Sequence, residues 1–166
     1  MLFYAGDVAE RRGATMHRHQ WSPDPPVPPE DPDEAVEDWV LADATPLLDA
    51  VGGSPLLIGK SLGSYAASLA AERGLPAVWL TPLLIAPPVT AALEQATAPF
   101  LLIGGTADRA WDGAAARLLT PHVCEVDGAD HGMYVPGPLV DSIAVLGRIV
   151  QAVEDFLDTI GWPAGP

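Results

Sequence analysis

Basic residues are scarce in this sequence. Its 166 residues include 8 Lys and Arg against 22 Asp and Glu, which gives a formal net charge of −14 at pH 7. Proteins that bind nucleic acids or anionic membrane surfaces need basic patches that neutralise phosphates. The composition therefore predicts no nucleic-acid partner and no membrane partner.

Cysteine and long apolar runs are nearly absent as well. The single cysteine, Cys124, excludes a disulfide framework within the chain and is expected to be a small, buried apolar side chain. No apolar run approaches the roughly 20 residues of a membrane helix, and the opening MLFYAGDVAE lacks the basic region and apolar core of a signal peptide. We therefore expect a cytoplasmic protein.

The apolar residues that are present, 49% of the chain, form short runs that alternate with helical patterns. Helices are expected at residues 1–12, 35–51, 62–74, 90–98, 113–120 and 139–160, and strands at 14–21, 55–60, 77–82, 99–105 and 122–127. Residues 22–34, rich in proline and acid, are expected to form an extended, solvated loop. Continuous apolar strands between helices predict one α/β domain over residues 1–166. Its expected form is a three-layer sandwich: a mostly parallel sheet of about five strands with helices on both faces.

The stretch GGSPLLIGKSLGS contains parts of two motifs. Its GKS matches the end of a phosphate-binding loop, but Ser54 stands where that loop needs glycine, and the PLLI that follows is typical of a buried strand. ATP binding is therefore a weak hypothesis. Its GKSLG matches a nucleophile elbow, in which the strand ends at Gly59, Ser61 lies on a sharp turn, and Gly63 permits the close approach of strand and helix.

An activated serine needs a base, and the base needs an acid to orient it. Asp108 follows one predicted strand in GGTADRAWD, and His131 follows another in DGADHGMY. Catalytic groups of parallel sheets gather beyond the carboxyl ends of the strands, so Ser61, Asp108 and His131 are expected to meet there. Each has a simpler interpretation: a turn or helix-capping serine, a capping aspartate with Asp112 as the substitute acid, and a surface-loop histidine.

The motifs GKSLGS, GGTAD and GADHG, in this order at three strand ends, resemble those of α/β-hydrolases. The resemblance is to the small, lidless kind, such as the dienelactone-hydrolase-like branch. It implies that Ser61 is the nucleophile, His131 the general base, Asp108 the orienting acid, and the Leu62 amide one oxyanion donor. It also implies a serine hydrolase that acts on a small ester or thioester through an acyl-enzyme and needs no cofactor.

Five further residues are candidates for the walls of a substrate pocket. Trp79, Trp111, Met133 and Tyr134 flank strand ends and could line an apolar acyl pocket, although core packing explains them as readily. Lys60 precedes the serine and could pair with an acid beside the site, but we favour a structural role at the strand end.

No metal site is predicted. His17 and His19 lie two positions apart on an expected strand and could share a face as a pair of ligands. No third ligand is evident in the sequence.

In the resembled fold, a strand and a glycine-rich loop precede the first helix, and an amide of that loop is the second oxyanion donor. Here the expected first helix lies at residues 1–12. An upstream start, closure of the strands at 14–21 and 55–60 onto each other, or a covering chain would repair the gap, and we favour closure or a homodimer. The same gap motivates the alternative of a non-catalytic α/β-hydrolase-like binding or scaffold protein.

Overall fold

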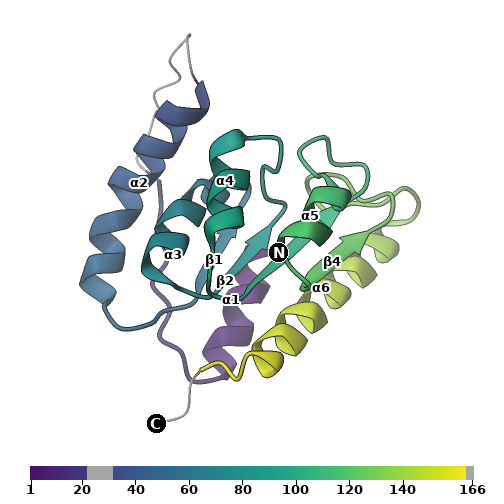
Figure 1. The fold of residues 1–166 in the computed structure, drawn as a ribbon. Coiled ribbons are helices and arrows are strands. Elements are labelled where there is room, and N and C mark those ends of the chain that lie inside the picture. The colour runs from purple at the N-terminus through teal and green to yellow at the C-terminus, as the bar shows by residue number, and fades with distance from the viewer. Residues whose placement is uncertain (22–31, 164–166) are drawn as a thin grey trace.

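Four parallel strands form the centre of the computed structural model, which describes residues 1–21 and 32–163 (Figure 1). The strands lie side by side in chain order: β1 (Leu57–Lys60), β2 (Ala77–Leu80), β3 (Phe100–Gly105) and β4 (Val123–Val126). In the register, Gly59 pairs with Trp79, Trp79 with Leu102, and Leu102 with Val123. All four strands therefore end at the same edge of the sheet.

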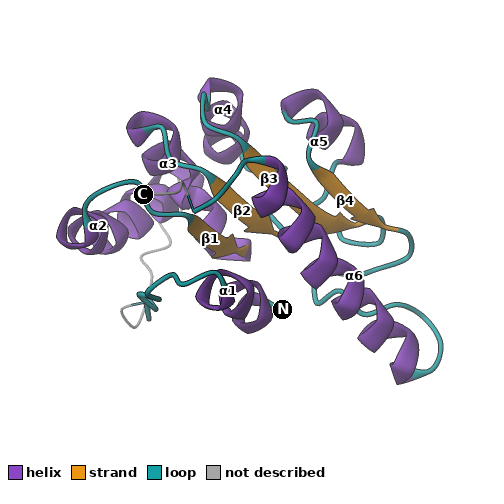
Figure 2. Cartoon of the chain, turned by 90° about the horizontal axis from the view of Figure 1, so that it is seen from below, coloured by secondary structure: helices purple, strands orange, loops and turns teal. Residues whose placement is uncertain are grey.

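Helices cover both faces of this sheet (Figure 2). α1 (Leu2–Arg11) and α6 (Leu139–Thr159) pack against one face. The other face carries α2 (Pro32–Val51), the 3₁₀ helix η1 (Ser61–Ala66), α3 (Ala67–Arg73), α4 (Pro87–Gln95) and α5 (Gly113–Leu119). The predicted α/β sandwich is thus confirmed.

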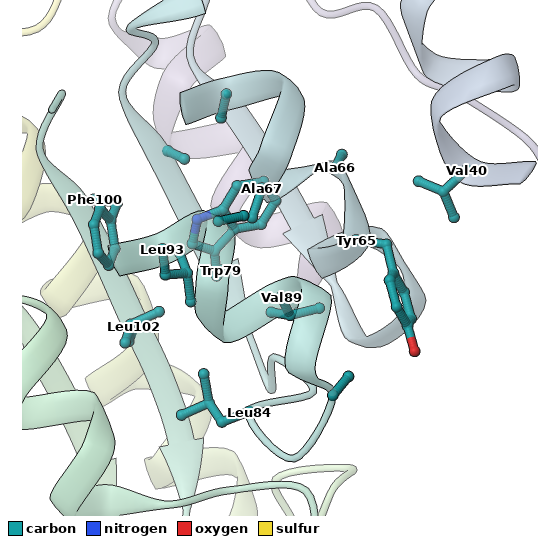
Figure 3. Packing of buried hydrophobic residues seen from close by; sticks show 14 of the residues in the cluster. Val40, Tyr65, Ala66, Ala67, Trp79, Leu84, Val89, Leu93, Phe100 and Leu102 are labelled. Carbon is teal, nitrogen blue, oxygen red and sulfur yellow. The ribbon is translucent and has the colours of Figure 1, made fainter. Parts of the chain in front are cut away.

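Each face of the sheet has its own hydrophobic core because successive side chains of a strand point to opposite sides. Trp79 and Leu102 enter the core beneath α3 and α4, which Figure 3 shows from close by. Val78 and Ile103, one position away in the same strands, enter the core beneath α1 and α6. All four side chains are at most 1% exposed, so the apolar runs are strands buried on both faces.

The prediction of a strand at residues 14–21 is wrong. The sheet of the described residues has four strands rather than about five, β1 lies at its edge, and closure of residues 14–21 onto β1 does not occur. The side chains of this segment contact α1 and α2 instead, and the guanidinium of Arg18 lies 3.5 Å from the carboxylate of Glu10 in α1. The rings of Trp21 and Trp39 lie 5.5 Å apart, and His19 Nε2 lies 3.4 Å from Asp43 Oδ2. An alternating pattern predicts extended backbone, but a strand also needs a neighbour with which to exchange hydrogen bonds.

Part of the predicted proline-rich loop is helical. Residues 22–31 of that loop lie outside the described residues, but Pro32, Asp33 and Glu34 form the first turn of α2. Proline is well tolerated at the start of a helix, and acidic side chains there interact favourably with the helix dipole.

The cysteine lies where the sequence predicts a strand. Cys124 is half-buried in β4, and burial raises the pKa of its thiol, although the charge of Arg148 acts in the opposite direction. None of the helices that the structure describes combines the length and the apolar character needed to cross a lipid bilayer.

Candidate active site

Three side chains from three strand ends meet in one hydrogen-bonded chain. Nε2 of His131 lies 2.8 Å from Oγ of Ser61, and its Nδ1 lies 2.7 Å from Oδ2 of Asp108. Ser61 follows β1 directly, Asp108 follows β3, and His131 follows β4. Because parallel strands end at a common edge, the fold brings together residues that are up to 70 positions apart.

The backbone of Ser61 is held in a sharp turn. Lys60 before it is extended, whereas Ser61 itself has a φ of +50°, which is uncommon for residues other than glycine. A backbone in this region costs about 1–3 kcal/mol and persists only where its surroundings hold it. The turn lifts the hydroxyl of Ser61 out of the sheet edge towards the imidazole.

The buried hydroxyl of Ser64 holds this turn. Its Oγ donates a hydrogen bond to the carbonyl of Ser61 (2.7 Å) and accepts one from the backbone N–H of Leu83 (3.1 Å). The side chain is buried, so both groups depend on it rather than on water. Sequence reasoning missed Ser64, whose signal is a hydroxyl three positions after the candidate nucleophile, at the start of an otherwise apolar helix.

Gly59, rather than Gly63, is the glycine on which the turn depends. A Cβ atom on Gly59 would lie 2.5 Å from the ring of Trp79 and 2.8 Å from the carbonyl oxygen of Gly63. A Cβ atom on Gly63 would meet no heavy atom within 4 Å, so the close approach expected at Gly63 occurs at Gly59. The elbow pattern contains both glycines and does not say which one lies against a neighbour.

Asp108 is oriented by its own loop. Its Oδ1 accepts a hydrogen bond from the N–H of Ala110 (2.9 Å), which leaves Oδ2 for His131. The side chain is shielded from water, with 4% of its surface exposed. Asp112, the substitute acid, instead caps α5 by accepting hydrogen bonds from the N–H groups of Ala114 and Ala115.

The loop that carries His131 is closed by its neighbour Asp130. Oδ1 of Asp130 accepts hydrogen bonds from the N–H groups of Gly132 (2.8 Å) and Tyr134 (2.9 Å), and its own N–H donates to the carbonyl of Tyr134 (2.9 Å). The imidazole is 41% exposed, so a reactant can approach it from solvent. The aspartate before the candidate base is a second residue that sequence reasoning missed; Asp is common in turns because its side chain bonds nearby backbone N–H groups.

The two predicted pocket tryptophans lie in packed positions. Trp79 is 1% exposed, and its ring covers Gly59. The ring of Trp111 covers Gly104 of β3, and its Nε1 donates a hydrogen bond to Glu125 (2.8 Å). Both rings pack in the core beneath α3 and α4, so the burial of apolar surface is enough to explain a tryptophan at each position.

The other predicted pocket residues lie near the hydrogen-bonded chain. Met133 is buried and Tyr134 is exposed, and both line a hollow that is described further below. Lys60 ends β1 and is half-buried beside Ser61. Leu62 lies in the first turn of η1, where helix N–H groups lack an acceptor within the helix and can bind an anionic oxygen.

A metal centre has no support in residues 1–21 and 32–163, because no three His, Cys, Asp or Glu side chains there are grouped to hold an ion. His19 is engaged with Asp43 of α2 and with the ring of Trp21.

The structure resembles those of known proteins, whereas comparison of the sequence finds no match. No protein-family model matches the sequence, and no curated protein matches it. The structure is similar to a monoacylglycerol lipase from Paleococcus ferrophilus, with a TM-score of 0.51 and 16% identity over 70% of this chain and 76% of that one. It is also similar to an alpha-beta serine hydrolase homologue from Coxiella burnetii, with a TM-score of 0.55 and 15% identity over 87% of this chain and 64% of that one. The chain therefore has an α/β-hydrolase fold, with a four-stranded parallel sheet in its described part.

Proposed function

We propose that the protein is a serine hydrolase that cleaves a small ester or thioester. The observation that supports this proposal is the hydrogen-bonded chain from Ser61 through His131 to Asp108, with distances of 2.8 and 2.7 Å. A hydroxyl, an imidazole and a shielded carboxylate in this order form a nucleophile, its base and the group that orients the base.

In the first half of the reaction, Nε2 of His131 takes the proton of Ser61 as Oγ attacks the substrate carbonyl. Asp108 accepts the hydrogen bond from Nδ1–H and stabilises the imidazolium that forms. The imidazolium then donates its proton to the departing alcohol or thiol, which leaves an acyl group on Ser61. In the second half, His131 activates a water molecule that releases the acid and restores the serine.

The negative charge on the carbonyl oxygen needs hydrogen-bond donors. The N–H of Leu62, at the start of η1, is the donor that this chain offers next to the nucleophile. Loss of one such donor costs about 100 to 1000-fold in rate, so we expect slow turnover where Leu62 acts alone.

Labelling with a fluorophosphonate probe tests the proposal directly, because the probe reacts with an activated serine without a need for a known substrate. We expect wild type to be labelled on Ser61 and Ser61→Ala to stay unlabelled. Ser68→Ala is the control, because Ser68 is a half-buried helix serine whose hydroxyl bonds to the Tyr65 carbonyl. If folded wild type is not labelled, the proposal is wrong and a non-catalytic binding or scaffold role is favoured. The cytoplasmic location and the homodimer remain predictions from the sequence.

A further inference from the structure

A hollow of about 180 Å³ lies between the loop that carries His131 and the beginning of α6. From the loop, Met133 and Tyr134 line it. From α6, Leu139, Ile143 and Leu146 line it, and their spacing of four and three residues places them on one face of the helix. Met1 also contributes to the wall, so the hollow is built mainly, but not entirely, by two elements that follow His131 in the chain.

The walls of this hollow are mostly apolar. Among the described residues no acidic, basic or histidine side chain lines it, although Met1, which carries the α-amino group, does. The hydroxyl of Ser142 in its wall accepts a hydrogen bond from the N–H of Val135 (3.1 Å). Tyr134, Leu139 and Ile143 nevertheless remain 59%, 66% and 59% exposed. Large apolar side chains gathered around a concave surface mark a place where an apolar group binds.

The hollow begins next to His131, the residue that gives its proton to the leaving group in the proposed mechanism. In the proposed mechanism, the leaving oxygen must come within hydrogen-bond reach of Nε2 of His131 to receive its proton. The lining begins at Gly132, the next residue in the chain, and the ring of Tyr134 packs over Gly132. Gly132 places one end of the hollow next to His131, and we take the part of the substrate attached to the leaving oxygen to extend into it.

We propose that this hollow binds the alkyl chain of the alcohol part of the ester. The inference rests on the proposed function and deepens it, since it names esters of unbranched aliphatic alcohols as the substrate class. It assigns Met133 and Tyr134 to the alcohol side of the site, whereas the sequence suggested the acyl side. An apolar cavity of about 150 Å³ holds a benzene molecule, so a hollow of this size takes an alkyl chain of about six to eight carbons.

Two ester series measured with purified protein test the inference. In the first, acetate esters of the alcohols from ethanol to decanol are compared; in the second, ethyl esters of the acids from acetate to decanoate. A fully buried methylene is worth about fourfold in kcat/KM, and a half-buried one about twofold. We expect kcat/KM to rise about 16-fold from ethyl to hexyl acetate and to level off near eight carbons. We expect the acyl series to be flat within about threefold, which is less than the effect of two half-buried methylenes.

Surface variants locate the effect. Leu139→Ser and Ile143→Ser remove apolar wall, and each should lower the ratio of kcat/KM for hexyl acetate to that for ethyl acetate about threefold. Leu118→Ser is the matched control, because Leu118 lies on α5, outside the hollow, and is 89% exposed. It should leave the ratio unchanged. All three side chains are largely exposed, so the variants are expected to fold, which circular dichroism checks.

The outcomes separate this inference from the proposed function. If Ser61 is labelled by the fluorophosphonate but the alcohol series is flat, or if the acyl series rises instead, the hollow does not bind the alcohol and the inference is overturned alone. If Ser61 is not labelled, both are overturned. A dimer in light scattering that Leu139→Ser dissociates, together with a flat alcohol series, assigns the hollow to a second copy of the chain and also overturns the inference.

Discussion

Replacement of Gly59 by alanine probes the contact on which the candidate nucleophile turn depends. The added Cβ would lie 2.5 Å from a ring carbon of Trp79 and 2.8 Å from the carbonyl oxygen of Gly63, whereas ordinary contacts begin at 3.4 Å. Trp79 is 1% exposed and packed on all sides, so the ring cannot swing into solvent. The ring or the turn must move by about 0.6 to 0.9 Å to reach an ordinary contact distance.

This displacement has a cost in stability and a cost in rate. Overpacking of a buried site destabilises a protein by about 1–3 kcal/mol, and we expect the free energy of unfolding of Gly59→Ala to fall by that amount. The carbonyl of Gly63 belongs to the turn that carries Ser61, so the hydroxyl moves with it. A misplacement of about 1 Å can cost 100-fold in rate, and we therefore expect fluorophosphonate labelling to slow by about 10 to 100-fold.

Gly63→Ala is the matched control. No heavy atom lies within 4 Å of its Cβ position, and alanine is favoured over glycine in a helical turn by about 0.5–1 kcal/mol. Urea unfolding followed by circular dichroism and the rate of labelling should therefore both stay close to wild type. If Gly63→Ala is impaired as much as Gly59→Ala, or if Gly59→Ala behaves as wild type in both assays, the reasoning from this contact is refuted.

Two further predictions concern residues of the same segment. Ser64→Ala leaves the N–H of Leu83 without its acceptor, so we expect the free energy of unfolding to fall by about 1–3 kcal/mol and fluorophosphonate labelling to slow. Ser68→Ala is the control and should change neither quantity. Equal behaviour of the two variants would contradict the role of Ser64. Burial, with the hydrogen bond to Asp33, raises the pKa of Tyr65 in the folded state, so the stability that its protonated form provides is complete below about pH 10 and is lost as the pH rises above it. The urea midpoint of wild type should therefore fall more steeply between about pH 9.5 and 11 than that of Tyr65→Phe, and parallel curves would count against this.

The sequence was most informative where a pattern is local. The apolar runs that became β1 to β4 are short and continuous, and the helices between them carry their own start and stop signals, so their order was predicted correctly. The rule that catalytic groups follow parallel strands then predicts that Ser61, Asp108 and His131 lie at one edge of the sheet. The structure brings these three side chains within hydrogen-bond distance.

The sequence was least informative where a residue's role depends on a distant partner. The segment 14–21 has the alternation of a strand, but no strand lies beside it in the described part of the chain, and its side chains contact α1 and α2. Trp79 and Trp111 flank strand ends, as pocket residues do, yet each covers a glycine that lies in a strand. Neither a missing neighbour nor a glycine beneath a ring is visible in the letters around these residues.

The sequence by itself determined the alternation of strands and helices and the positions of a hydroxyl, a carboxylate and an imidazole just after three strands. Both follow from periodicity and from turn-forming residues, which act over a few positions. Only the tertiary structure decided that Gly59 is the tight position, that Ser64 and Asp130 hold the two loops, and that an apolar hollow follows His131. These features are contacts between surfaces that the chain brings together only when it folds, and their existence depends on distances that no local pattern encodes.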